Sequence, residues 1–252
     1  MSQLPPLHSR ELQRLQWRQV QALVPSQIRT LILPVGTVEA HGSACIGTDN
    51  YIPESISLAV AEPLSALVAP IVNHGITRSL IRYPGGTTVS PATFSAYVSE
   101  IIESAALSGF KEFFIMNGHG GNNSALKQVA LDLHREHGLC IAVIHWWELV
   151  EKITEQHFGH AGGHAGTDET AMVIAIDPKL ADEKSYSPDL AYTFVPGADI
   201  YPVPGTVLLY KEGEGYPEFD LIKAKEYQTK VFAAVRDFCV MIQSRWRNAG
   251  LS

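Results

Sequence analysis

The sequence has little of what marks an exported, membrane-spanning or nucleic-acid-binding protein. Its 252 residues include three cysteines, which are too widely spaced to indicate a disulfide framework or a Cys-x-x-Cys metal site. No apolar run approaches the ~18 residues of a membrane span, and the N-terminus lacks the basic segment and apolar core of a signal peptide. Lys and Arg form no run and the net charge is −7, which argues against a polyanionic partner. We therefore expect a cytoplasmic protein that binds neither nucleic acid nor membrane.

Short β-like runs alternate with longer helical patterns along the chain, which favours an α/β layered fold with a largely parallel sheet. No repeat or flexible linker divides the sequence, so we expect a single domain over 1–252. Strands are expected over 29–33, 67–72, 112–116 and 139–145, and two short β-like runs within 194–210. Helices are expected over 51–67, 90–106, 122–137 and 221–246, and another beyond residue 168.

The expected helix over 90–106 has the clearest start signal. Ser90 precedes a proline, as an N-cap residue does when proline takes the first helical position. The apolar spacing in this segment predicts that Phe94, Tyr97, Ile101 and Ile102 face the core.

Five potential metal ligands crowd into three short Gly-rich segments, 34–49, 117–122 and 163–170. Glycine frees the backbone, so carboxylates and imidazoles in such turns can converge on one point. A mixed set of oxygen and nitrogen ligands without thiolate suits Zn²⁺ or Mn²⁺, and an unevenly shared set suits a pair of ions. The candidate ligands are Glu39, His41, Asp49, His119 and Glu169.

These ligands are expected to lie at one end of the sheet, because ligands gather beyond the carboxyl ends of parallel strands. Glu39, His41 and Asp49 follow the first expected strand, and His119 closely follows the strand over 112–116. Glu169 lies near the start of a later helix, where backbone N–H groups favour an anion. The three segments therefore predict one site.

Taken in order, the three blocks resemble the signatures of the creatininase (creatinine amidohydrolase) family. The blocks are Pro-Val-Gly-Thr-Val-Glu-Ala-His-Gly (34–42) with Gly-Thr-Asp (47–49), Asn-Gly-His-Gly-Gly-Asn (117–122) and His-Ala-Gly-Thr-Asp-Glu-Thr (164–170). The resemblance implies a three-layer α/β/α fold with a mostly parallel central sheet and a binuclear metal centre. It also implies an amidohydrolase that acts on the non-peptide C–N bond of a small cyclic amide or formamide, commonly as a homo-hexamer.

The resemblance further implies a role for each residue. Glu39 and His119 would bind one ion, His41 and Glu169 the other, and Asp49 would bridge the two. His164 matches the catalytic histidine of the family. Two divalent ions, Zn²⁺ and/or Mn²⁺, can share a hydroxide and polarise an amide carbonyl. An imidazole with a pKa near 6.5 can then pass a proton to the leaving nitrogen.

The sequence departs from creatininase proper in three places. The segment between His41 and Asp49 is shorter and lacks a second histidine; Gly120 and Gly121 replace an aromatic residue and a glutamate; and no tryptophan lies shortly before His164. These departures point away from creatinine itself. The Gly-Gly version resembles relatives that hydrolyse formamides of nucleobase-derived compounds or trim a modified peptide. A catalytically silent metal-binding or scaffold protein is a further alternative.

Rival residues remain for several roles. Asp168 neighbours Glu169, and His160 begins a second His-Ala-Gly run like that of His164, although we interpret it as a loop histidine bound to backbone. Cys45, between the ligands of the first block, is an alternative thiol ligand or nucleophile. Either tryptophan of the pair at 146–147 can wall the pocket or lie in the core. Cys140 and Cys239 are expected to be small core residues.

Overall fold

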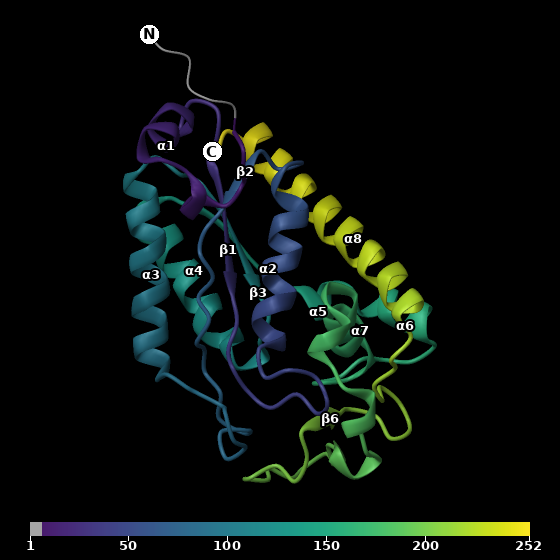
Figure 1. Ribbon diagram of the computed structural model, residues 1–252. Coiled ribbons are helices and arrows are strands. Elements are labelled where there is room, and N and C mark those ends of the chain that lie inside the picture. The colour runs from purple at the N-terminus through teal and green to yellow at the C-terminus, as the bar shows by residue number, and fades with distance from the viewer. Residues whose placement is uncertain (1–6) are drawn as a thin grey trace.

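The computed structural model describes residues 7–252, and at its centre four parallel strands stand in the order β2-β1-β3-β4 (Figure 1). In register, Leu31 of β1 pairs with Leu67 of β2 and with Phe113 of β3. A separate two-stranded parallel sheet joins β5 and β6. The strands are β1 (Thr30–Val35), β2 (Ala66–Val68), β3 (Glu112–Asn117), β4 (Cys140–His145), β5 (Ala191–Thr193) and β6 (Val207–Leu209).

Helices cover both faces of the four-stranded sheet (Figure 1). The α-helices are α1 (Trp17–Leu23), α2 (Thr48–Ala61), α3 (Pro91–Leu107), α4 (Asn123–His137), α5 (Trp146–Leu149), α6 (Glu151–Phe158), α7 (Thr167–Ile176) and α8 (Leu221–Asn248). Short 3-10 helices span Leu12–Arg14, Gly120–Asn122, Pro178–Leu180, Glu183–Ser185 and Pro188–Leu190.

Alternation along the strands divides the core into two clusters, one on each face of the sheet. Successive side chains of a strand point to opposite faces, so Ile32 and Phe114 pack with α2, α7 and α8. Leu31 and Phe113 point the other way and pack with α3 and α4. The expected three-layer α/β/α architecture with a parallel central sheet is therefore confirmed.

Helix α3 begins where the sequence predicts, because the Ser90 hydroxyl accepts a hydrogen bond from the Thr93 backbone N–H at 3.1 Å. Its buried face consists of Phe94, Val98 and Ile102. The prediction that Tyr97 faces the core was wrong: Tyr97 is 56% exposed. The buried stripe follows a strict four-residue spacing, which turns Tyr97 toward solvent.

Two element boundaries differ from expectation at prolines. Strand β1 continues through Pro34 instead of ending there, because the Pro34 nitrogen faces the side on which the short strand β2 has already ended. Helix α2 begins at Thr48, earlier than expected, and ends at Ala61, two residues before Pro63.

Two short β-like runs were expected within 194–210, but this segment contains one strand, β6. The other short strand, β5, ends at Thr193, just before the segment begins. Cys140 and Cys239 are buried, as expected. Among residues 7–252, no helix combines the length and apolar character that a membrane span requires. The single domain over the whole chain stays a prediction.

The edge of the sheet formed by the strand starts holds a buried carboxylate. Glu112, at the start of β3, accepts hydrogen bonds from Nε and Nη2 of Arg247 on α8, both at 2.8 Å. Gln243 Nε2 and the Ser252 hydroxyl donate to it as well, at 3.1 and 2.7 Å. Burial alone raises the pKa of Glu112, but the bonds from Arg247, Thr30 and Ser252 outweigh it and lower the pKa to about 2.

This depressed pKa predicts an acid-sensitive contribution to stability. The contribution is fully present above the ordinary pKa of a glutamate and is lost as the pH falls toward 2. We expect Glu112→Gln to lower the free energy of unfolding at pH 7 by about 2–3 kcal/mol and to flatten the loss of stability between pH ~4.5 and ~2. Urea denaturation across this range measures both effects. Asp237→Asn, which removes an exposed pair with Arg236 on the same helix, should change stability by less than about 1 kcal/mol; equal effects would contradict the assignment.

Candidate functional site

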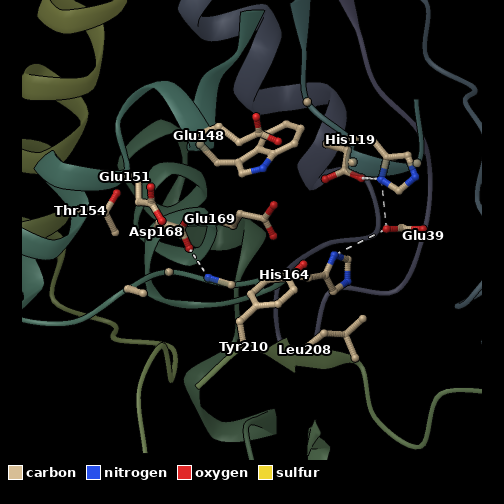
Figure 2. A pocket seen from close by; sticks show the side chains of 18 of the residues that line it. Glu39, His119, Glu148, Glu151, Thr154, His164, Asp168, Glu169, Leu208 and Tyr210 are labelled. Atoms are coloured by element: carbon tan, nitrogen blue, oxygen red, sulfur yellow. Dashed lines mark hydrogen bonds and ion pairs between the residues drawn. The ribbon is translucent and has the colours of Figure 1, made fainter. Parts of the chain in front are cut away.

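A cavity of about 430 Å³ opens at the carboxyl end of the parallel strands (Figure 2). Its wall receives side chains from the loops after β1 and β3, from the segment of α5, α6 and α7, and from β6 and the residue that follows it. Glu39, Asp49, His119, His164 and Glu169 all reach this cavity. The structure therefore brings the three Gly-rich segments to one place.

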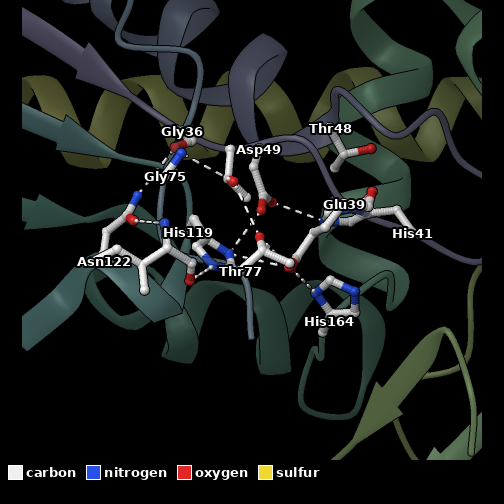
Figure 3. A network of polar contacts seen from close by, with 12 residues as sticks. Gly36, Glu39, His41, Thr48, Asp49, Gly75, Thr77, His119, Asn122 and His164 are labelled. Carbon is white, nitrogen blue, oxygen red and sulfur yellow. Dashed lines mark hydrogen bonds and ion pairs between the residues drawn. The ribbon is translucent and has the colours of Figure 1, made fainter. Parts of the chain in front are cut away.

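Asp49 lies at the centre of the cluster, between two imidazoles (Figure 3). Its Oδ1 is 2.9 Å from Nε2 of His41, and its Oδ2 is 2.9 Å from Nδ1 of His119. The second contact does not have hydrogen-bond geometry, so Oδ2 is a buried oxygen without a hydrogen-bond partner among the described residues. Asp49 belongs to the first turn of α2, where the helix dipole stabilises a negative charge.

Two further carboxylates complete the cluster, one on each side of Asp49. Glu39 Oε1 lies 3.3 Å from Nδ1 of His119, and its Oε2 accepts a hydrogen bond from the Thr77 hydroxyl at 2.8 Å. Glu169 Oε2 lies 3.6 Å from Nε2 of His41 and accepts the Ala165 backbone N–H at 2.6 Å. Each carboxylate thus has one oxygen held by the protein and faces an imidazole.

The imidazoles are oriented by backbone carbonyls on their outer sides. Nδ1 of His41 lies 3.0 Å from the Glu39 carbonyl, and Nε2 of His119 lies 3.1 Å from the Ile76 carbonyl. A ring nitrogen bound to a carbonyl carries the proton, so the other nitrogen of each ring presents its lone pair to the carboxylates when the ring is neutral. Ligating histidines are held in this way at metal sites.

The charges of the cluster compete for protons. Burial alone lowers the pKa values of His41 and His119, but the neighbouring carboxylates outweigh it and raise them to about 10 and about 9. Burial raises the pKa of Glu39 and of Glu169. Burial also opposes ionisation of Asp49, yet His41 and His119 overcome it and lower the Asp49 pKa. Without another cation, protonated imidazoles supply the positive charge that these buried carboxylates require.

Ligand atoms within the cluster fall into groups that lie within 4.8 Å of one another. One group contains Glu39, Asp49 and His119, and a second contains His41, Asp49 and Glu169. Asp49 is common to both. A third group joins Glu39 and His41 to His164.

His164 lies beside the cluster rather than between the carboxylates. Its ring centroid is 4.2 Å from that of His41, and its Nε2 is 2.9 Å from the Ala40 carbonyl. Its Nδ1 faces Glu39 Oε1 at 3.5 Å. The pKa of 6.5 expected from the sequence does not hold here, because burial and the charge of His41 lower it to about 3.

None of the rival residues belongs to a group of potential metal ligands among the described residues. His160 accepts the Gly215 backbone N–H at Nδ1 and contacts Glu218 through Nε2, outside the cavity wall. Asp168 lines the cavity but accepts the Gly163 N–H at 3.0 Å and joins no group of potential metal ligands among the described residues. Cys45 joins none of these groups either, and lies 3.9 Å from the Thr48 hydroxyl.

Of the two tryptophans, Trp146 is fully buried in the core and Trp147 lines the cavity.

Sequence reasoning missed further residues around the site. Thr77 comes from the loop after β2, which carries no motif. The missed cavity residues are Ser79, Leu80, Glu148, Glu151, Thr154, Phe194, Leu208 and Tyr210. For the last two, the β-like run at 207–210 indicates that they share a face, because side chains two apart on a strand point the same way.

Sequence comparisons extend over most of the chain. The sequence model of the Creatininase family, described as creatinine amidohydrolase, matches residues 13–209. A creatinine amidohydrolase of Pseudomonas putida is 29% identical over 208 residues, which are 75% of this chain and 80% of that protein. A mycofactocin precursor peptide peptidase of Mycobacterium ulcerans (strain Agy99) is 27% identical over 169 residues, 62% of each chain.

Solved structures share the architecture. A creatinine amidohydrolase (creatininase) crystal structure superposes with a TM-score of 0.81 at 24% identity, covering 92% of this chain and 96% of the other, which shows the fold. A creatininase structure described as the Mn form gives a TM-score of 0.76 at 26% identity, covering 91% and 96%. A mutant creatininase described as Zn-Zn type gives 0.76 at 25%, covering 92% and 97%.

The glycine pair after His119 offers a test of how tightly the cluster is packed. A Cβ on Gly121 would lie 2.2 Å from the Ile76 carbonyl oxygen and 2.4 Å from His119 Nε2, so it would disrupt the bond that orients this ring. A Cβ on Gly120 would lie 3.9 Å from its nearest neighbour, Cζ2 of Trp147. We expect Gly121→Ala to weaken divalent-metal binding by about 10-fold or more, and Gly120→Ala to change it little. Titration of both variants with Zn²⁺ and Mn²⁺ measures this; equal affinities would show that His119 does not depend on the close approach.

Proposed function

Because the chain belongs to the creatininase family, hydrolases that act on carbon–nitrogen bonds other than peptide bonds, we propose that it is a metal-dependent amidohydrolase for a small cyclic amide or formamide. The observation that carries this proposal is the position of Asp49. Its two carboxylate oxygens each lie 2.9 Å from a different imidazole, within two groups of potential metal ligands.

The residues present fit a pair of divalent ions. Within the described part of the chain, Asp49 Oδ2 is a buried oxygen without a hydrogen-bond partner, although an imidazole nitrogen lies 2.9 Å away. Two ligand atoms that approach each other without forming a hydrogen bond suit a shared cation. In this proposal Glu39, Asp49 and His119 hold one ion, and His41, Asp49 and Glu169 hold the other. Mixed oxygen and nitrogen ligands suit Zn²⁺ and Mn²⁺, and solved creatininase structures include forms named for both metals.

Bound in this way, the ions would supply an activated water and polarise the amide carbonyl. The protein's own part falls to His164. Its outer nitrogen is held by the Ala40 carbonyl, so Nδ1 presents a lone pair beside Glu39. When the ring is neutral, this lone pair can accept a proton, and His164 would then pass the proton to the leaving nitrogen.

A second candidate is the trimming of a modified peptide. The peptide peptidase relative from Mycobacterium ulcerans motivates it. A peptide would place its scissile bond at the same ligand cluster, so the two candidates differ in substrate and not in machinery. The hexameric assembly and the cytoplasmic location stay predictions.

Metal stoichiometry tests the proposed bridge. We expect the wild type to hold two divalent ions per chain and Asp49→Ala to hold fewer than one, because the bridging carboxylate offsets the repulsion between neighbouring dications. His41→Ala or Glu169→Ala should mainly weaken the binding of one ion. Glu39→Ala or His119→Ala should mainly weaken the binding of the other.

Elemental analysis after dialysis measures these occupancies. Glu148→Gln is the matched control, since it removes a carboxylate of the same cavity outside both ligand groups and should retain two ions. An Asp49→Ala protein with two ions beside a Glu39→Ala protein with none would assign the bridge to Glu39.

Turnover tests His164. The Mn²⁺- and Zn²⁺-loaded protein is screened with lactams, creatinine, formamidopyrimidines and small peptides. With whichever compound is hydrolysed, His164→Ala should lower kcat by about 10²–10⁴-fold without changing metal content. His160→Ala is the control and should keep near-normal turnover. Two bound ions without turnover of any compound would favour a catalytically silent metal-binding protein, while full activity in His164→Ala would remove this residue from the reaction.

A further inference from the structure

Tyr210 lies on the cavity wall because of its place after β6. Side chains alternate along an extended chain, and Leu209 is buried against Ala165 and Val207 on the outer side. Leu208 and Tyr210 therefore face the cavity, and both line it. Figure 2 shows Tyr210 and His164 among the side chains that line the cavity.

The same strand positions His164. The backbone N–H of His164 donates to the Leu208 carbonyl at 3.0 Å, and the Leu208 N–H donates to the His164 carbonyl at 2.9 Å. Tyr210 follows two residues later, so its ring is held at a set place relative to the candidate catalytic imidazole. One face of the ring stacks on Phe194, with centroids 5.5 Å apart and planes at 23°.

Tyr210 is 69% exposed, although it belongs to a cavity wall. A large aromatic surface left open within a concave site contributes binding energy when a ligand covers it. Phe194 supports the ring from behind, so the ring need not reorganise to present its free face. This arrangement suits a flat ligand.

Carboxylates line the same cavity as Tyr210. Outside the proposed ligands and His164, the ionisable side chains of the cavity are the carboxylates of Glu148, Glu151 and Asp168. Although the Tyr210 side chain is largely exposed, partial desolvation within the cavity and the charges of Glu169, Asp168, Glu148 and Glu39 raise its pKa. The phenol therefore stays protonated at neutral pH and acts as a hydrogen-bond donor.

We propose that Tyr210 binds the substrate: its ring covers a flat amide, and its hydroxyl donates a hydrogen bond to an acceptor atom of that amide away from the proposed metal ligands. This inference rests on the proposed function of the same cavity and names the class of substrate. The carboxylates of Glu148 and Asp168 select for N–H groups on the substrate. The fitting substrate is thus a compact planar amide that carries both N–H donors and a second acceptor.

Two substitutions separate the ring from the hydroxyl. With the amide that the wild type hydrolyses best, Tyr210→Phe should raise KM about 5- to 10-fold, since it loses one hydrogen bond. Tyr210→Ala should raise KM further, about 50-fold or more, because the aromatic wall is lost as well. We expect kcat to change by less than about 3-fold in both, because uniform binding is lost and the chemistry is kept. Metal content should remain that of the wild type.

Tyr97→Phe and Tyr97→Ala are the matched controls, since Tyr97 is an exposed tyrosine on α3 outside the cavity wall. They should leave KM unchanged. Circular dichroism and thermal unfolding of all four variants report on folding, and Tyr210→Phe keeps the packing on Phe194 if Tyr210→Ala unfolds.

The outcomes distinguish this inference from the proposed function. An active, metal-loaded wild type with unchanged KM in both Tyr210 variants would overturn the role of Tyr210 alone. If the wild type shows no turnover, binding is measured by ligand-observed NMR with creatinine and hydantoin as flat probes. Weaker binding of either probe to Tyr210→Ala than to Tyr97→Ala supports the inference. Equal binding to both, or no binding of either probe to the wild type, overturns it.

Discussion

Asp49 lies at the first turn of α2 with an imidazole nitrogen 2.9 Å from each of its carboxylate oxygens, and the whole cluster is arranged around it. A buried carboxylate is costly unless it is paired, and here two other carboxylates lie close by. The arrangement persists because positive charge enters from several sides: the helix dipole, the two imidazoles and, in the proposed holoenzyme, two metal ions. The outer nitrogens of those imidazoles are in turn tied to backbone carbonyls. Backbone geometry in the Gly-rich loops therefore sets where charge can be held.

Buried carboxylates lie at both edges of the parallel sheet, but their negative charge is balanced differently at each edge. At the edge formed by the strand starts, Glu112 is matched within the chain by Arg247, which leaves its charge satisfied by protein alone. At the carboxyl edge the carboxylates outnumber the cationic side chains among the lining residues, and only imidazoles oppose them. A closed ion pair stabilises the fold. An open excess of negative charge at the other edge is the property that would recruit the proposed cations, and the sheet separates the two edges by the length of its strands.

Sequence reasoning reached the ligand cluster because each block follows a buried strand or opens a helix, and the carboxyl ends of parallel strands share an edge. The α/β layered fold with a largely parallel sheet followed from the alternation of elements, and its three-layer arrangement followed from the family resemblance. Tyr97 shows the limit of periodicity: apolar spacing places a stripe on a helix, but the neighbours decide which side of the stripe is covered. Thr77 and Tyr210 show a second limit, since their segments reach the site only through tertiary packing. The pKa of His164 is a third, because it depends on burial and on the charge of His41.

The small β5–β6 sheet has a consequence for how this scaffold can change. With the residue that follows it, this sheet contributes Leu208 and Tyr210 to the cavity yet none of the five proposed metal ligands, which come from the loops after β1 and β3, from α2 and from α7. A directed-evolution library confined to residues 191–210 can therefore reshape this part of the cavity wall while the segments that carry the proposed metal ligands keep their sequence. The backbone bonds between Leu208 and His164 are kept in such a library, because they do not depend on which side chains the strand carries. New substrate ranges are thus open to exchange of this short segment alone.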